Sequence, residues 1–263
     1  MEYKNLFDLT GKVCIVTGGT GYLGSENVKA LKDFGATVVI ADIRASEERW
    51  ANAVQAEGDM FVPIDIADAE SVRNCYKTVF EKYGRIDVVV DTAVFGAGFG
   101  IESQLEHMED TTFMKGIDGS LGSAFRCVHE VIPYMKKTGG SIITYGSMYG
   151  VVSPDLRIYG DSDQRQPANY GAGKAGVQQF TRYAAGALAP YGIRVNCVIP
   201  GPFPNPKSKA DNDGFNEILA NKTMLGRTGV NHEMAGAVLL LASDASSFMT
   251  GSSITVDGGW TAW

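Results

Sequence analysis

The chain has few of the residues that build metal centres and disulfide frameworks. Its 263 residues include only four cysteines and three histidines. No two cysteines form a CxxC pair, and each sits in an apolar or amphipathic segment, so we expect buried, reduced thiols. The histidines lack ligand spacing and an accompanying acidic or cysteine cluster, so we expect no metal site. The cysteines are Cys14, Cys75, Cys127 and Cys197.

Basic clusters and long apolar runs are also missing. The formal net charge is −7 and no run of lysine or arginine stands out, which argues against nucleic-acid binding. No apolar stretch approaches the roughly 20 residues of a membrane-spanning helix. The first residues lack a basic-then-apolar targeting signal. These absences predict a cytoplasmic protein whose partner is a small-molecule substrate.

Apolar runs alternate with longer amphipathic stretches along the whole chain. The runs are rich in β-branched residues without polar alternation, which is typical of strands buried on both faces of a parallel sheet. Strand–helix alternation of this kind predicts a doubly wound, Rossmann-type α/β sheet. With no internal repeat and no linker, residues 1–263 are expected to form one domain. The expected strands are 13–16, 37–41, 60–64, 87–90, 141–144, 194–198 and 253–256, and the expected helices are 22–34, 46–56, 69–83, 107–137, 168–190 and 232–243.

A glycine-rich turn joins the first expected strand to the first expected helix. Gly18, Gly21 and Gly24 allow a tight turn, a close backbone approach and close packing of helix on strand. The helix would then direct its first backbone N–H groups at a pyrophosphate. The pattern predicts a dinucleotide site, although each glycine alone is equally consistent with an ordinary turn.

Acidic residues end the second and third expected strands. Asp42 is placed to accept hydrogen bonds from the ribose hydroxyls of adenosine and to repel a 2′-phosphate, which favours NAD over NADP. The alternative is a helix cap or a solvated strand end. Asp65, which Ile66 follows, could contact the adenine amino group, but a plain loop acid is an equal alternative.

Tyr170 and Lys174 stand four positions apart on an expected helix, so both side chains leave the same face. A free phenol has a pKa of about 10, and a neighbouring ammonium lowers that pKa by favouring the phenolate. Such a pair can exchange a proton with a carbinol or carbonyl oxygen. The alternative is a packing tyrosine beside a surface lysine.

Taken in order, these motifs resemble the short-chain dehydrogenase/reductase family from about Leu9 to Trp260. The glycine-rich turn, the two acids, Ser147 and the Tyr170/Lys174 pair are followed by an Asn-Cys-Val-Ile-Pro-Gly segment and a closing Val-Asp-Gly-Gly-Trp. The resemblance implies a seven-stranded parallel sheet, a nicotinamide cofactor and hydride transfer to or from a carbon that bears oxygen. It also implies a homotetramer or homodimer in which the long helices meet.

The resemblance implies a role for each matching residue. Tyr170 would be the general acid/base, Lys174 would lower its pKa and bond the nicotinamide ribose, and Ser147 would bond the substrate oxygen. Asn205 falls where the family often has a threonine for the carboxamide. The remaining implied cofactor contacts are Gly18, Thr20, Gly21, Tyr22, Leu23, Gly24, Asp42, Ile43, Asp65, Ile66, Thr92, Ala93, Pro200, Gly201 and Phe203.

Three features depart from the family pattern. Tyr22 replaces a usual glycine, and the usual Asn-Asn-Ala-Gly after the fourth strand reads Asp91-Thr92-Ala93-Val94. Ser120 aligns with the helix asparagine that completes the family's catalytic tetrad and orders a water beside the lysine. A serine is shorter, so proton exchange with solvent is expected to run differently.

Substrate loops are expected near 148–169 and 200–230. The first contains a long polar insertion, 153–166, between Ser147 and Tyr170. As a substrate wall it favours a hydroxyl-rich or anionic ligand over an acyl chain or steroid, so we expect an NAD-preferring oxidoreductase of a sugar, polyol or sugar acid. An inert surface loop is the alternative reading of the insertion. Reduction of a 3-oxoacyl thioester and a non-catalytic dinucleotide-binding homologue remain open as alternative functions.

Overall fold

The computed structural model describes residues 2–43, 60–206 and 213–263. Within these ranges seven strands form one sheet in the order β3-β2-β1-β4-β5-β6-β7, and every neighbouring pair is parallel. The predicted seven-stranded Rossmann-type fold is therefore confirmed. The strands are β1 (Val13–Thr17), β2 (Thr37–Asp42), β3 (Met60–Pro63), β4 (Val88–Asp91), β5 (Gly140–Tyr145), β6 (Ile193–Pro200) and β7 (Ser253–Val256).

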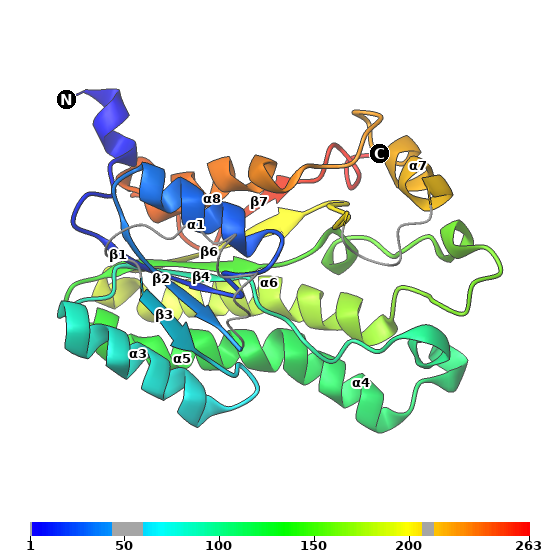
Figure 1. The fold of residues 1–263 in the computed structure, drawn as a ribbon, viewed down its shortest axis with the longest axis horizontal. Coiled ribbons are helices and arrows are strands. Elements are labelled where there is room, and N and C mark those ends of the chain that lie inside the picture. The colour runs from blue at the N-terminus through cyan, green and yellow to red at the C-terminus, as the bar shows by residue number, and fades with distance from the viewer. Residues whose placement is uncertain (1, 44–59, 207–212) are drawn as a thin grey trace.

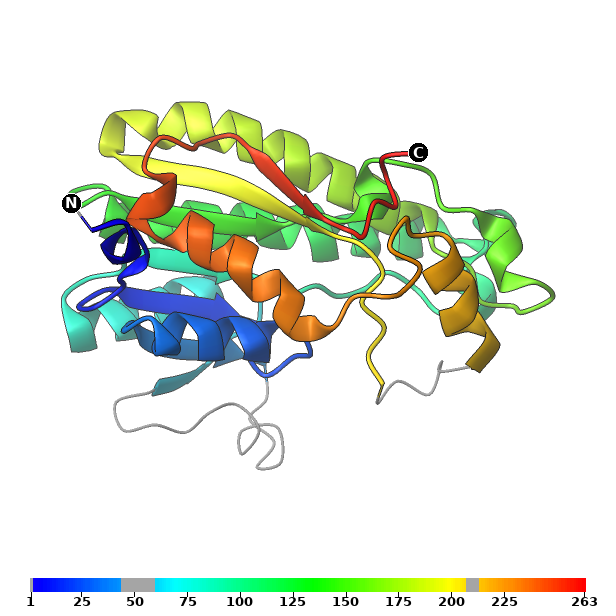
Figure 2. The ribbon, with the colours of Figure 1, turned by 90° about the horizontal axis from the view of Figure 1, so that it is seen from above.

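Helices cover both faces of the sheet (Figures 1 and 2). On one face lie α1 (Gly24–Asp33) and α8 (Ala235–Ala242), and on the other lie α3 (Ala69–Tyr83), α5 (Ser123–Met135) and α6 (Ala168–Leu188). This double cover explains why the central strands β1, β4 and β5 read as largely apolar runs, since both of their faces are buried.

Alternate residues of β1 show how the two cores are built. Val13 and Ile15 point into the core beneath α3, α5 and α6. Cys14 and Val16 point into the core beneath α1 and α8. Each such fully buried aliphatic side chain stabilises the fold by about 1.5–3 kcal/mol relative to exposure.

The expected helix 107–137 is helical from Asp110 to Met135, but it contains a π turn that the sequence did not predict. The structure has α4 (Asp110–Ile117), a π-helical turn over Asp118–Gly122, and then α5. His107 lies in a separate 3-10 turn before α4. A Cβ on Gly119 would overlap the Phe95 carbonyl oxygen, so the backbone at the π turn approaches Phe95 as only glycine allows.

Part of the segment near 200–230, which we expected to be a substrate loop, folds as α7 (Asp213–Asn221). The expected helix 46–56 lies outside the described residues. No helix in the described ranges is both long and apolar enough to span a bilayer.

The strands all end on the same side of the molecule, at the right in Figure 1. The loops that follow β1, β4 and β5, the insertion before α6, and α7 all gather beyond these strand ends (Figure 1). The strand order also reverses between β1 and β4. In open α/β sheets, ligands bind in the crevice at such a reversal, outside the carboxyl ends of the strands.

Candidate active site

The glycine-rich turn after β1 borders this crevice and has no room for a side chain at Gly18 or Gly24. Gly18 adopts φ +64°, and a Cβ there would come within 2.9 Å of Thr92 Oγ1. A Cβ on Gly24 would overlap the Gly18 carbonyl oxygen. The Gly21 amide donates to that same oxygen at 2.9 Å. The bare turn at the start of α1 fits a pyrophosphate, because backbone N–H groups and no side chains face it.

The neighbouring residues of the turn anchor it to the surrounding helices. Leu23 packs on the core beneath α1 and α8. The Tyr22 carbonyl oxygen accepts a hydrogen bond from Asn231 Nδ2 at 3.2 Å. Tyr22, which replaces a family glycine, is therefore accommodated at the end of the turn.

Asp42 lies at the end of β2, beside the glycine-rich turn. Its Oδ2 accepts hydrogen bonds from the Thr20 backbone N–H at 3.1 Å and from Thr20 Oγ1 at 2.6 Å. Its Oδ1 accepts from the Ile43 backbone N–H at 2.8 Å. The carboxylate is thus held at the edge of the turn, where the adenosine ribose of a dinucleotide would lie.

Asp65 and Ile66 shape the chain after β3. Asp65 Oδ1 accepts from the Ala67 backbone N–H at 2.9 Å, and the Ile66 carbonyl accepts from Arg126 Nη1 at 3.2 Å. The side chain of Asp65 therefore supports a local turn in this structure, and an adenine contact remains an expectation.

The rebuilt turn after β4 is tied directly to the glycine-rich turn. Thr17 Oγ1 donates to Asp91 Oδ1 at 2.8 Å, Thr92 Oγ1 donates to the Thr17 carbonyl, and the Ala93 amide contacts Thr17 Oγ1 at 3.4 Å. Burial raises the pKa of Asp91, while the hydrogen bond from Thr17 and the charge of Lys174 act in the opposite direction. The substitution of acid for the usual asparagine therefore places a buried carboxyl between the cofactor turn and Lys174.

Tyr170 and Lys174 lie one turn apart on α6, as the spacing predicts. Lys174 Nζ is 5.9 Å from the centre of the Tyr170 ring and donates to the Tyr145 carbonyl oxygen at 2.7 Å. The lysine side chain is only 5% exposed. The carbonyl of Tyr145 therefore fixes the ammonium beside the ring, and the remaining donors of the ammonium stay available to other groups.

Ser147 lies just beyond β5, against α6. Its Oγ accepts from the Tyr149 backbone N–H at 3.2 Å, and its carbonyl oxygen is 3.5 Å from Gln178 Nε2 of α6. Of the two tyrosines that flank Ser147, Tyr145 is turned into the core beneath α1 and α8, where its hydroxyl accepts from Asn27 Nδ2 at 2.6 Å. Only Tyr149 faces the carboxyl end of the sheet.

Ser120 sits in the π turn between α4 and α5 and faces α6. It is 3% exposed, and its Oγ has no hydrogen-bond partner among the described residues. A Cβ on Gly173, the residue before Lys174, would lie 2.7 Å from Ser120 Cβ. Asn169 Oδ1 is a second buried acceptor without a hydrogen-bond partner among the described residues. Asn169 lies four residues before Gly173, on the same face of α6. Buried polar atoms without a protein partner are typical water sites.

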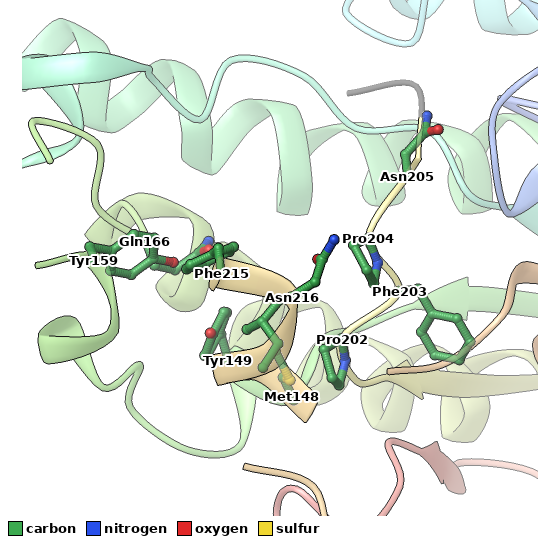
Figure 3. A pocket seen from close by; sticks show the side chains of 11 residues that line it. Met148, Tyr149, Tyr159, Gln166, Pro202, Phe203, Pro204, Asn205, Phe215 and Asn216 are labelled. Atoms are coloured by element: carbon green, nitrogen blue, oxygen red, sulfur yellow. The ribbon is translucent and has the colours of Figure 1, made fainter. Parts of the chain in front are cut away.

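A cavity of about 260 Å³ lies beside the segment that follows Ser147 (Figure 3). It is flanked by Met148 and Tyr149, which directly follow Ser147, and Tyr170 packs against the same hydrophobic cluster. Pro200 ends β6, and the Gly201 amide bonds the Val256 carbonyl at 2.9 Å, which aims the following prolines at the cavity. The lining residues are Met148, Tyr149, Tyr159, Gln166, Pro202, Phe203, Pro204, Asn205, Phe215, Asn216 and Leu219.

The sequence did not single out several of these lining residues, notably Tyr149, Tyr159, Gln166 and Phe215. Tyr159 comes from the insertion, whose charged composition suggested a purely polar wall. The adjacent Ile158 and Tyr159 are apolar, and this pair could have indicated that one side of the insertion packs against the protein interior. Phe215 belongs to α7, and nothing in the sequence placed it near Ser147.

Among the described residues, no three histidine, cysteine or acidic side chains gather as a metal site. All four cysteines are buried free thiols, as predicted. Burial raises the pKa of Cys197 and of Cys75, the latter to about 12. Thiols of this kind are packing residues and not nucleophiles.

The parallel sheet, the bare glycine turn and the Tyr170/Lys174 pair define a nicotinamide-dependent oxidoreductase, and comparison with known proteins agrees. A family model described as Enoyl-(Acyl carrier protein) reductase matches residues 22–261. The 3-oxoacyl-[acyl-carrier-protein] reductase FabG of Thermotoga maritima is 36% identical, covering 95% of this chain and 98% of that protein. The trans-4-hydroxycyclohexanecarboxylate dehydrogenase of Sinomonas cyclohexanicum is 34% identical, covering 95% and 93%.

Solved structures show the same fold over the whole chain. The crystal structure of gox2181 superposes with a TM-score of 0.89 at 33% identity, covering 100% of both chains. A gluconate 5-dehydrogenase of Burkholderia cenocepacia, in complex with NADP and tartrate, superposes at 0.86 with 26% identity and 100% coverage of both. A short-chain dehydrogenase of Leptospira borgpetersenii with bound NAD+ superposes at 0.85 with 28% identity, covering 99% and 96%.

The chain belongs to the short-chain dehydrogenase/reductase family and is an oxidoreductase. Non-catalytic dinucleotide binding, which the sequence left open, is therefore set aside.

Proposed function

We propose that the protein is an NAD-preferring dehydrogenase that interconverts a secondary alcohol and a ketone on a compact substrate such as a sugar derivative, a polyol or an alicyclic alcohol. The observation that carries this proposal is the fixed Tyr170/Lys174 pair beside the cavity that follows Ser147. The pair supplies proton transfer, and the cavity supplies space for a substrate.

Each of the three residues has a distinct role in the proposed reaction. Ser147 donates a hydrogen bond to the substrate oxygen and holds it near the Tyr170 hydroxyl. In the oxidative direction, Tyr170 accepts the proton of the substrate hydroxyl, and Lys174 stabilises the phenolate. A bound nicotinamide accepts the hydride, and the protein's contribution is positioning and electrostatics.

The cavity favours a substrate with at least one apolar face. Most of its wall is carbon from Met148, Phe203, Phe215, Leu219 and prolines. Aromatic rings bury the C–H faces of both sugar rings and cyclohexane rings. None of the described charged residues of the insertion lines the cavity, and Asp155 pairs with Arg157 at 2.8 Å and with Lys222 at 3.0 Å. The polarity of the insertion is thus a weaker argument for sugars than its sequence suggested.

The preference for NAD rests on Asp42. Its fixed carboxylate lies at the edge of the glycine-rich turn and would repel the 2′-phosphate of NADP. The similar solved structures contain NAD+ in one case and NADP in another. The fold therefore accepts both cofactors, and the residues around the adenosine ribose decide which one is preferred.

Reduction of a 3-oxoacyl thioester is the second candidate, favoured by the 36% identity to FabG of Thermotoga maritima. The apolar cavity wall is compatible with a short acyl chain. The two candidates are separated by a substrate panel of cyclic alcohols, polyols and 3-oxoacyl thioesters, followed by NADH absorbance.

The Tyr170→Phe variant tests the mechanism. It removes only the phenolic oxygen, so turnover of the best substrate should fall at least about 100-fold, the usual contribution of a general acid/base, while NADH still binds. Turnover is followed by absorbance and cofactor binding by fluorescence titration. Wild-type turnover in this variant would contradict the mechanism.

A further inference from the structure

The polar groups of the active-site cavity come from very few residues. Of the eleven side chains that line it, none among the described residues is charged. Three carry amides, Gln166, Asn205 and Asn216, and two carry phenols, Tyr149 and Tyr159. In such an apolar wall, a substrate that leaves one of these polar groups buried without a hydrogen-bond partner binds less well. Each polar group therefore has a large effect on substrate specificity.

The two phenols are neutral groups in the cavity wall. Burial raises the pKa of Tyr149 and Tyr159, so both stay protonated near neutral pH. A phenol hydroxyl can donate one hydrogen bond and also accept. Tyr149 is buried whereas Tyr159 is only partly buried, so the hydroxyl of Tyr159 is the more accessible of the two to a ligand in the cavity.

Gln166 is the second polar group at this end of the cavity. Its side-chain amide has no hydrogen-bond partner among the described residues. Figure 3 shows Gln166 and Tyr159 beside each other, with Phe215 next to them, while Pro202, Phe203, Pro204 and Asn205 form the opposite side. Phe215 packs against the Tyr159 ring at 5.4 Å between centres and so restricts its orientation.

Both residues belong to the insertion, and the insertion is held in place from outside. Gln164 Oε1 accepts from the Gly100 backbone N–H at 2.7 Å. Gln104 Nε2 donates to the Asp163 carbonyl at 3.0 Å. The Arg165 backbone N–H donates to Ser103 Oγ at 2.7 Å. These bonds fix residues 163–165, which lie between Tyr159 and Gln166 in the chain, so the two polar groups are preorganised.

We propose that Tyr159 and Gln166 form a subsite that hydrogen-bonds a second, uncharged oxygen of the substrate, remote from the carbon that reacts. The proposal rests on the proposed function, because it assigns specificity to the same cavity. The phenol donates, and the amide can donate or accept, so a hydroxyl or carbonyl group fits. A carboxylate fits less well, since neither residue offers a compensating charge.

The wild-type enzyme can be tested with matched ketones. Cyclohexanone is compared with 3- and 4-hydroxycyclohexanone as substrates for NADH-dependent reduction. We expect kcat/KM to be about 3–10-fold higher for at least one hydroxyketone, the range of one net hydrogen bond. If no turnover is measured, the dissociation constants of the same ketones for the enzyme–NADH complex are compared by fluorescence. Equal values for all three ketones would overturn the proposal.

Two conservative variants assign the preference to the named residues. In Tyr159→Phe and in Gln166→Met, the ratio of kcat/KM for the preferred hydroxyketone over cyclohexanone should fall toward one. Tyr3→Phe, a phenol 81% exposed near the N-terminus, is the matched control and should keep the wild-type ratio. A wild-type ratio in both cavity variants would show that the second oxygen binds elsewhere.

The ratio of kcat/KM for the hydroxyketone over cyclohexanone tests the subsite separately from the Tyr170→Phe test of the mechanism. If Tyr159→Phe loses the preference for the hydroxyketone and Tyr170→Phe is inactive, both the subsite and the mechanism are supported. If Tyr170→Phe keeps full turnover while Tyr159→Phe loses the preference, the mechanism fails but the subsite stands.

Discussion

Asp42 and Thr20 are joined by two hydrogen bonds, at 3.1 and 2.6 Å, which clamp the end of β2 to the glycine-rich turn. The carboxylate that is expected to select the cofactor also supports the turn that is expected to hold it. Cofactor choice and local stability are therefore coupled in this chain.

Replacing this carboxylate should change the cofactor preference. In Asp42→Ala, the ratio of kcat/KM for NAD over NADP should fall at least about tenfold, because charge repulsion of a few kcal/mol at partial burial is removed. Thr20→Val is the matched control, since it removes one hydrogen bond but keeps the charge, and its ratio should stay near wild type. A wild-type enzyme that already prefers NADP would show that the ribose argument is wrong.

Ser120 offers a test of the water site beside α6. Because its buried Oγ has no protein partner, Ser120→Ala should leave the free energy of unfolding within about 1 kcal/mol of wild type or raise it. If a water bound to Ser120 serves proton exchange, the same variant lowers kcat without changing KM. Ser120→Asn, which restores the family residue, should be tolerated or mildly activating. A collapse of activity in Ser120→Asn would show that the serine belongs to a different relay.

Asp91 should make stability depend on pH in a defined direction. Burial raises its pKa above the unfolded value of 3.8, so the folded state favours the protonated form. That contribution is fully present below pH 3.8 and is lost as the pH rises through the raised folded pKa. Asp91→Asn lacks the ionisation, so its free energy of unfolding relative to wild type should increase as the pH rises toward 7. Urea unfolding at several pH values measures this, and a difference that is flat or falls with pH would contradict it.

An aromatic cluster on the outer faces of α5 and α6 bears on assembly. Phe125 is 49% exposed, stacks on His129 at 5.3 Å and meets the edge of Phe180 at 5.9 Å. We propose that this face is buried in a homodimer or homotetramer, since exposed apolar clusters mark interfaces. Phe125→Asp should reduce the mass measured by light scattering, whereas Phe248→Asp, on a fully exposed residue elsewhere, should not. An unchanged mass in Phe125→Asp would place any subunit contact on another surface.

The strands were the elements that the sequence predicted most accurately, because their apolar pattern matches their burial in the folded protein. All seven strands fall within two residues of the predicted bounds, because a strand buried on both faces must be apolar at every position. The π turn inside the expected helix 107–137 was not predicted, and its Gly119 lies against the Phe95 carbonyl oxygen. These residues are distant along the chain, so periodicity could not reveal the contact.

The sequence by itself determined the fold, the bare glycine turn and the one-turn spacing of Tyr170 and Lys174, because each depends on short stretches of chain. Only the tertiary structure decided that Lys174 bonds the Tyr145 carbonyl, that Ser120 has an unpartnered hydroxyl, and that Tyr159 turns inward from a charged insertion. Those relationships join separate segments, and their energies come from packing and burial that a linear pattern does not record.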